Sequence, residues 1–305
     1  MPRHAPASLI LCLAGLLSCG RIPASAPEPA FEVWHLASPG EGDMIVIDSA
    51  SLRPVVVHGE MVALDRIVRF SNFQGSRFHP DPVRALSEDG QVMDGFARTL
   101  ARSIPPGAAL VIDLQGIPAD EIRSLSQFTR ALVGAAATLT GSHAAMIVPA
   151  GDTVSYPTAV LARVVDLLLV RLWGEYRPGT RPGPPMTSDL IRRELGSRAT
   201  AVGASHIAAY FPLHGYLWNS VDSARPVTFE EANRLVVRQG GAFRRDPASR
   251  FLTATSRDGW TIWVPDLTTL ETLIQAARSR GATVIALSHF RGADPAILSR
   301  YPIRR

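Results

Sequence analysis

The chain has 305 residues, of which 46% are hydrophobic, and its formal net charge is +4. This length and composition suit one barrel-sized globular domain with a sizeable core. All 31 cationic residues are arginines, and their short runs are scattered instead of forming a basic stripe with interleaved aromatics. The sequence therefore gives little support to nucleic-acid binding, whereas guanidinium groups suit anionic or hydroxyl-rich ligands.

The first 30 residues have the pattern of a targeting segment. A weakly basic start precedes an apolar run at 8–17, which is too short to span a bilayer as a lasting helix. The run ends in Leu-Leu-Ser-Cys-Gly around Cys19, which resembles a bacterial lipobox, where the cysteine becomes the lipidated first residue. We expect a signal peptide at 1–18 and a lipidated, proline-containing tether at 19–30, which would anchor the protein in the cell envelope, on the periplasmic or outer-membrane side. The alternative is an ordinary secretory signal that contains a chance cysteine.

Beyond the tether, apolar strands alternate with amphipathic helical stretches. Strands are expected at 32–36, 44–48, 55–57, 66–73, 109–114, 144–149, 166–173, within 199–211 and at 283–287. Helices are expected at 82–86, 91–103, 120–139, 157–164 and 267–280. This alternation implies a mostly parallel sheet and favours an α/β fold of the TIM type, a (β/α)8 barrel over 31–305. Residues 31–64 are few for two complete units, so the barrel is expected to be shortened at its N-terminal end.

One segment, 224–264, breaks the alternation. Thr228 followed by Glu231 forms a capping-box pattern at the start of a helix, and Gly240 suits its C-terminal end. Short apolar runs around a turn at Gly259 then indicate small antiparallel strands. We therefore predict a compact α+β insertion before the last barrel unit.

The strand at 109–114 carries the strongest functional signal. It ends in Asp113-Leu114-Gln115, and residues two apart on a strand point to the same face. An acid and an amide would therefore project together from the strand end, where α/β barrels carry their catalytic groups. An amide cannot transfer a proton as a carboxyl group can, so the identity of residue 115 decides much about enzymatic function.

Four stretches carry a family resemblance: Phe70–Phe73, Val111–Gln115, Asp166–Tyr176 with Pro182–Pro184, and Leu213–Trp218 with Val264–Asp266. In order and spacing they resemble glycoside hydrolase family 18, the chitinase-like barrels, especially the bacterial branch of spore-cortex and polysaccharide-associated proteins. The stretches are similar to that family's third strand, its catalytic strand, its sixth strand, and its seventh strand together with the segment after it. The resemblance spans roughly residues 66–295 and implies a barrel fold.

The resemblance also implies a chemistry. In that family a glutamate donates a proton to the leaving oxygen, and an aspartate two residues earlier orients the substrate's own N-acetyl group. Asp113 corresponds to the orienting aspartate, and Gln115 occupies the acid position, where general acid catalysis is worth about 10²–10⁴-fold. The other departures are Val111 for the outer acid, Arg171 and Gly174 for a methionine and an aspartate, and Ser288 for a tryptophan. Together these changes indicate that the hydrolytic machinery has been lost.

Several other residues are candidates for the site. Glu175 is a displaced acid or a solvated loop residue, and Asp113 is a site residue or a strand-end carboxylate paired with Arg171. The candidate sugar-binding residues, each with packing or capping as its alternative role, are Asn72, Trp173, Tyr176, Tyr216 and Trp218. His206 and His214 show no metal-ligand spacing, and we expect neither a metal nor a cofactor.

Three functional hypotheses remain open. The first is a non-catalytic, polysaccharide- or oligosaccharide-binding or scaffold lipoprotein of the cell envelope. The second is a glycosidase acting on an N-acetylated, chitin- or peptidoglycan-like polysaccharide, which is slow or specialised or uses Glu175 in a rearranged site. The third is a structural partner in exopolysaccharide assembly that binds no sugar in its barrel. Gln115 favours the first and third hypotheses, and the retained Asp113 and aromatics favour the first over the third.

Overall fold

The computed structural model describes residues 31–37, 44–48, 50–57, 67–74, 77–174, 180–220 and 223–303. The chain divides into two compact units, Met1–Ala30 and Phe31–Arg305, and every described residue belongs to the second. Within this described part, no helix has both the length and the apolarity needed to cross a membrane. The predicted signal peptide and tether lie outside the described residues.

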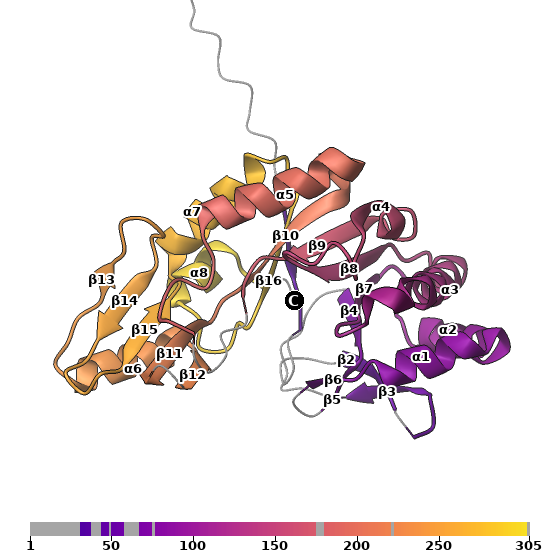
Figure 1. Ribbon diagram of the computed structural model, residues 1–305, viewed down its shortest axis with the longest axis horizontal. Helices are drawn as coiled ribbons and strands as arrows, with labels where there is room; N and C mark the ends of the chain where they lie inside the picture. The colour runs from indigo at the N-terminus through magenta and orange to yellow at the C-terminus, as the bar shows by residue number, and fades with distance from the viewer. Residues whose placement is uncertain are drawn as a thin grey trace, which may run out of the picture. The chain divides into compact units, whose positions relative to one another are not determined.

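The described unit is built on one large sheet with eight parallel strands. In chain order these are β1 (Glu32–His35), β2 (Met44–Ile47), β4 (Ile67–Ser71), β7 (Ala109–Asp113), β8 (Ala144–Pro149), β9 (Leu167–Arg171), β10 (Ile207–Pro212) and β16 (Val284–Ser288). Their order in the sheet is β1-β16-β10-β9-β8-β7-β4-β2, so the first strand lies beside the last, as in a (β/α)8 barrel. The predicted barrel-type fold is confirmed (Figure 1).

The ends of this strand order are β1 and β2. No pairing joins these two strands among the described residues, and β2 pairs instead with the antiparallel strand β3 (Pro54–Val57). Residues 38–43 and 58–66, which follow β1 and β3, lie outside the described part. The expected shortening of the N-terminal units therefore stays a prediction.

Side chains of the parallel strands alternate between two apolar layers. The inner layer includes Val111, Ala145, Ile147, Leu169, Ala208 and Ala286. The outer layer, packed under the helices, includes Leu110, Ile112, Met146, Leu168, Ala209 and Ile285. Burial on both faces explains why these strands are continuous apolar runs in the sequence instead of alternating patterns. It also places Asp113, two residues after Val111, on the inner face.

Helices cover the outer layer. They are α1 (Asp81–Glu88), α2 (Gly90–Arg102), α3 (Ile122–Thr140), α4 (Thr158–Leu161), α5 (Ser188–Val202), α7 (Leu267–Arg278) and α8 (Pro295–Arg300). The helices α1, α2 and α3 pack on one another, and α5 lies beside α7 (Figure 1).

Two of the described helices, α5 and α8, were not predicted from the sequence. The longer one, α5, begins after the N-cap Thr187 and runs to Val202, so the strand expected within 199–211 begins only at Ile207. Its inward-facing positions include Arg198, which is 1% exposed and donates to Thr158 Oγ1 at 2.9 Å. A buried arginine interrupts the apolar spacing by which a core-facing helix is recognised.

The α+β insertion exists but begins earlier than predicted. It comprises β11 (Gly215–Ser220), β12 (Ser223–Val227), α6 (Phe229–Arg238), β13 (Arg244–Arg245), β14 (Leu252–Thr255) and β15 (Thr261–Val264), with sheet order β12-β11-β15-β14-β13. Because β11 pairs with both β12 and β15, the insertion starts at Gly215 and not at 224. The stretch 213–218, which resembled the seventh strand, thus comes after that strand, β10. The predicted N-cap is confirmed, since Thr228 Oγ1 accepts from the Glu231 amide at 3.1 Å.

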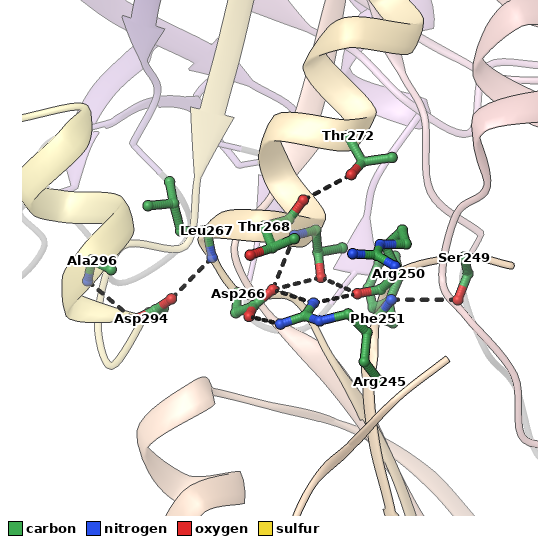
Figure 2. Close-up of polar contacts among 11 residues, drawn as sticks. Arg245, Ser249, Arg250, Phe251, Asp266, Leu267, Thr268, Thr272, Asp294 and Ala296 are labelled. Carbon is green, nitrogen blue, oxygen red and sulfur yellow. Dashed lines mark hydrogen bonds and ion pairs between the residues drawn. The ribbon is translucent and has the colours of Figure 1, made fainter. Parts of the chain in front are cut away.

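A polar network fastens the insertion to the start of α7 (Figure 2). Arg245 of β13 donates to Asp266 Oδ1 at 3.0 Å and to the Arg250 carbonyl at 2.7 Å, and it also contacts Asp266 Oδ2. Thr269 of α7 donates to the same two residues. Its backbone amide donates to the Asp266 carboxylate, and its hydroxyl donates to the Arg250 carbonyl. Burial raises the pKa of Asp266, but the hydrogen bonds from Arg245 and Thr269 outweigh this effect and hold the pKa below its usual value.

Candidate functional site

The carboxyl ends of the parallel strands meet at a pocket of about 290 Å³. Its lining residues are Arg69, Phe73, Phe78, Asp113, Ile147, Arg171, Trp173, Tyr210, His214, Tyr216, Pro226 and His289. The strands β4, β7, β8, β9 and β10 supply its polar and aliphatic floor. Its walls come from the hairpin β5–β6 (Phe73–Gln74 and Arg77–Phe78) and from the start of the insertion. Loops and insertions thus shape the site on a rigid sheet.

Asp113 is held by a buried arginine that was not identified from the sequence. Arg69 Nε donates to Asp113 Oδ2 at 3.2 Å, its Nη2 contacts the same oxygen, and its Nη1 contacts the Ala37 carbonyl. The side chains of Arg69 and Asp113 are only 7% and 2% exposed. The ion pair expected from sequence exists, but Arg69 of β4 forms it where Arg171 was expected. Since Ala37 follows β1, Arg69 of β4 also links the end of β1 to the end of β7.

Gln115 faces Asp113, as the two-residue spacing predicted. Its Nε2 donates to Asp113 Oδ1 at 2.9 Å and to the Ile147 carbonyl at 3.2 Å. An amide nitrogen carries two hydrogens, so these contacts use both of its donors. Gln115 is 4% exposed and does not belong to the pocket lining. The Gln115 side chain thus contacts Asp113 and Ile147 and does not line the pocket.

Asn72 has a structural role. Its Oδ1 accepts from the Gln115 amide at 2.9 Å, and its Nδ2 donates to the carbonyls of Gln115 at 2.9 Å and His79 at 3.0 Å. It is 1% exposed, and its side-chain donors are both engaged. The sequence offered ligand binding or strand-end capping for this residue, and the structure favours capping.

Aromatic rings form one side of the pocket. Trp173, after β9, meets Tyr210 edge-on at a centroid distance of 4.7 Å, and the Arg171 guanidinium lies 5.7 Å from the Trp173 ring centroid. Tyr216 of β11 contacts His214 at 5.3 Å. Two of the predicted sugar-binding aromatics, Trp173 and Tyr216, therefore line the pocket. Flat apolar rings of this kind suit the C–H faces of pyranose sugars.

Two histidines add to this aromatic side, and both have lowered pKa values. Burial lowers the pKa of His214 to about 4. Burial also lowers the pKa of His289 well below its usual value, with further lowering from His214 and the Arg69 guanidinium. Their ring centroids are 4.3 Å apart, and Ser288 Oγ lies 2.9 Å from His289 Nδ1. Both rings are neutral at pH 7 and supply no acidic proton there.

Of the other predicted sugar-binding residues, Trp218 is described and lies outside the pocket. It is 1% exposed within the insertion, so packing is its role. Glu175 and Tyr176 lie outside the described residues, as does the lipidation candidate Cys19. Across the described ranges, no group of three or more His, Cys, Asp or Glu side chains is placed to hold a metal ion.

Several of the lining residues were not identified from the sequence as site residues. They include Arg69, Phe73, Phe78, Tyr210 and His289. Arg69 had a detectable signal, because a cation inside the apolar run Ile67–Ser71 must find a buried partner. His289, which follows β16 with a left-handed backbone (φ 63°), had no such signal in the sequence.

No protein-family model and no curated protein sequence matches the chain, but solved structures do. A chitinase from Chromobacterium violaceum ATCC 12472 superposes with a TM-score of 0.72 at 18% identity, covering 88% of this chain and 97% of that one. The Bacillus cereus spore cortex-lytic enzyme SleL gives 0.71 at 10% identity, covering 88% and 72%. A class V chitinase from Nicotiana tobaccum, a glutamate-to-glutamine mutant in complex with NAG4, gives 0.70 at 13% identity, covering 89% and 97%.

These superpositions define the class of the domain. At identities of 10–18% they establish the fold, and that fold is the barrel of chitinase-type glycoside hydrolases. The domain is therefore chitinase-like, as the four motif stretches predicted. Gln115 occurs at the position that the motif resemblance assigns to the acid glutamate.

Proposed function

We propose that this protein is a glycan-binding or scaffold lipoprotein of the cell envelope that uses a chitinase-like barrel without hydrolysing its ligand. The observation that carries the proposal is the chemistry and hydrogen bonding of Gln115. An amide at the acid position has no proton to give, and both of its N–H groups are already donated to Asp113 and Ile147. Gln115 thus lacks even a free donor for a glycosidic oxygen.

Among the described lining residues, neither the carboxyl group nor the imidazoles supply a substitute acid at neutral pH. Asp113 is ion-paired with Arg69, and the histidines His214 and His289 are neutral because burial lowers their pKa values. Loss of general acid catalysis alone lowers a rate by about 10²–10⁴-fold.

Binding, by contrast, has good support. Trp173, Tyr216, Phe73 and Phe78 give the pocket apolar rings, and Arg171 adds guanidinium donors that suit sugar hydroxyls. The solved tobacco chitinase in complex with NAG4 is itself a glutamate-to-glutamine mutant. A barrel of this fold thus holds an oligosaccharide when a glutamate has been exchanged for an amide.

The cellular setting of the proposal comes from the sequence. The lipobox-like stretch ending at Cys19 supports export and lipidation, which would tether the barrel to the membrane through residues 19–30. A lipid-anchored, glycan-binding barrel fits a role in holding or organising an envelope polysaccharide, while secretion without an anchor is the alternative.

The experiment titrates the purified mature protein with chitin, peptidoglycan and exopolysaccharide oligomers while reducing ends are counted. The proposal predicts saturable binding to at least one glycan with no new reducing ends. Turnover that disappears in Asp113→Ala would support a slow glycosidase instead. Binding to none of the glycans would support a purely structural partner in polysaccharide assembly.

A further inference from the structure

The carboxylate of Asp113 borders the pocket, but both of its oxygens are already engaged by neighbouring side chains. Its Oδ2 takes two contacts from Arg69, and its Oδ1 takes the Gln115 amide hydrogen. Although Asp113 borders the pocket, its side chain is only 2% exposed. A ligand N–H group would have to displace a buried, charge-assisted pair to reach it.

Arg69 is itself fixed and cannot easily release Asp113. Its Nη1 contacts the Ala37 carbonyl, so moving the guanidinium would break contacts to two different strand ends. The side chain is 7% exposed and lies on β4, next to β7 in the sheet. The strand backbone therefore sets the Arg69–Asp113 geometry before any ligand arrives.

We infer that Arg69 removes recognition of an N-acetyl group from this pocket, so that the ligand is selected by ring stacking and hydroxyl contacts. The inference rests on the proposed glycan binding and specifies its ligand class. The pocket accepts a plain hexose where a chitinase-like site would require a 2-acetamido sugar. Arg69 is thus a specificity-determining residue that acts through Asp113.

A matched pair of ligands tests this inference directly. Chitotetraose and cellotetraose share β-1,4 linkages and differ at the 2-substituent. Calorimetric titration of the mature wild-type protein is expected to give dissociation constants for the two tetramers within about threefold of each other. The reason is that no hydrogen bond from the protein recognises the acetamido group. A preference of about tenfold or more for chitotetraose would overturn the inference.

Variants test whether Arg69 is the reason for the missing acetamido preference. Arg69→Met frees the carboxylate of Asp113 and is expected to create a preference of about tenfold for chitotetraose, which Arg69→Met/Asp113→Asn then loses. If Arg69→Met fails to fold, Asp113→Asn alone tests the inference. In this variant the ratio of the chitotetraose and cellotetraose affinities should stay at its wild-type value. A selective loss of chitotetraose binding in Asp113→Asn would contradict the inference.

The outcomes separate this inference from the proposed function. Binding of both tetramers with a clear acetamido preference overturns only the inference. Binding of neither tetramer also overturns the inference, while the wider glycan panel decides separately whether the protein binds glycans at all.

Discussion

Asn72 joins the two strand ends that carry the candidate site. Its amide satisfies both backbone groups of Gln115 and the carbonyl of His79 in a fully buried position. Leaving buried backbone groups without partners costs about 1–3 kcal/mol, and here two strand ends depend on the same side chain. The position of Gln115, and with it that of Asp113, is thus set by a residue that need not touch a ligand.

Asn72→Ala is expected to lower the free energy of unfolding by about 2–3 kcal/mol, because the backbone N–H and C=O of Gln115 lose their partners. Urea denaturation of the mature protein measures this loss. The exposed Asn233→Ala on α6 serves as a control and should stay within about 0.5 kcal/mol of wild type. An equally mild effect of Asn72→Ala would show that water replaces the lost contacts.

His214 gives the fold a pH dependence with a defined sign. Its folded-state pKa of about 4 lies below the usual value of 6.5, so the unfolded chain binds a proton that the folded chain rejects. Its contribution to stability is therefore complete above pH 6.5, declines as the pH falls toward 4, and is constant below that. The span corresponds to about 3 kcal/mol, since each pKa unit is worth about 1.4 kcal/mol.

This pH dependence is tested by comparing unfolding free energies at pH 7 and pH 4.5. His214→Gln should lose less stability between these values than the wild type does. His143→Gln, at a side chain that is 87% exposed, should follow the wild-type dependence. Identical pH dependences for all three proteins would contradict the burial of a neutral His214.

Among the secondary-structure elements, β11 is the one that joins the barrel to its insertion. A methyl group at Gly215 would lie 2.0 Å from the Trp263 carbonyl oxygen, so only glycine allows β11 to pair with β15. Tyr216, the next residue, lines the pocket. The close approach at Gly215 therefore helps to position one wall of the site.

Two glycine-to-alanine variants are expected to have opposite effects. Gly215→Ala should destabilise the protein by about 1–3 kcal/mol or more, because the backbone of β15 must move. Gly134→Ala, in the exposed interior of α3 with open space around it, should stabilise by about 0.5–1 kcal/mol. Thermal denaturation distinguishes them, and a neutral Gly215→Ala would mean that the β11–β15 pairing is not formed as described.

Much of the element pattern can be predicted from the sequence, for reasons that particular residues make clear. Apolar runs such as 109–114 predict strands correctly because both faces of the parallel sheet are buried. Asp113 and Gln115 lie on the same face because side chains on a strand repeat every two residues. The 2.9 Å hydrogen bond from Gln115 Nε2 to Asp113 Oδ1 agrees with this. Sequence reasoning fails where tertiary context decides, as at the buried Arg198 of α5.

The ion-pair partner of Asp113 was mispredicted for the same reason. Arg69 and Asp113 are 44 positions apart, and they meet because β4 pairs with β7. The register between these strands cannot be read from the sequence, so Arg171 was as good a candidate as Arg69. The insertion boundary was missed for a related reason, because the run 213–218 is compatible with a barrel strand until its pairing with β15 is known.

At the scale of the whole molecule, we expect a membrane tether joined to a chitinase-like barrel, with lipid on Cys19 of the mature protein. Metabolic labelling with a fatty-acid analogue should label the wild type and leave Cys19→Ser unlabelled, with the variant released from the membrane fraction. Cys12→Ser, which alters only the predicted signal peptide, should remain labelled. Labelling that persists in Cys19→Ser would exclude the lipobox and favour a simple secretory signal.

The central claim is that this barrel binds a glycan and leaves it intact. The most direct test incubates the mature wild-type protein with an oligosaccharide that it binds, at a saturating concentration, and counts reducing ends over many hours. A matched Glu175→Gln variant is assayed in parallel. Both proteins are expected to bind the oligosaccharide, and neither is expected to release new reducing ends. Turnover by the wild type that disappears in Glu175→Gln would contradict the claim and identify a working acid outside the Asp113–Gln115 pair.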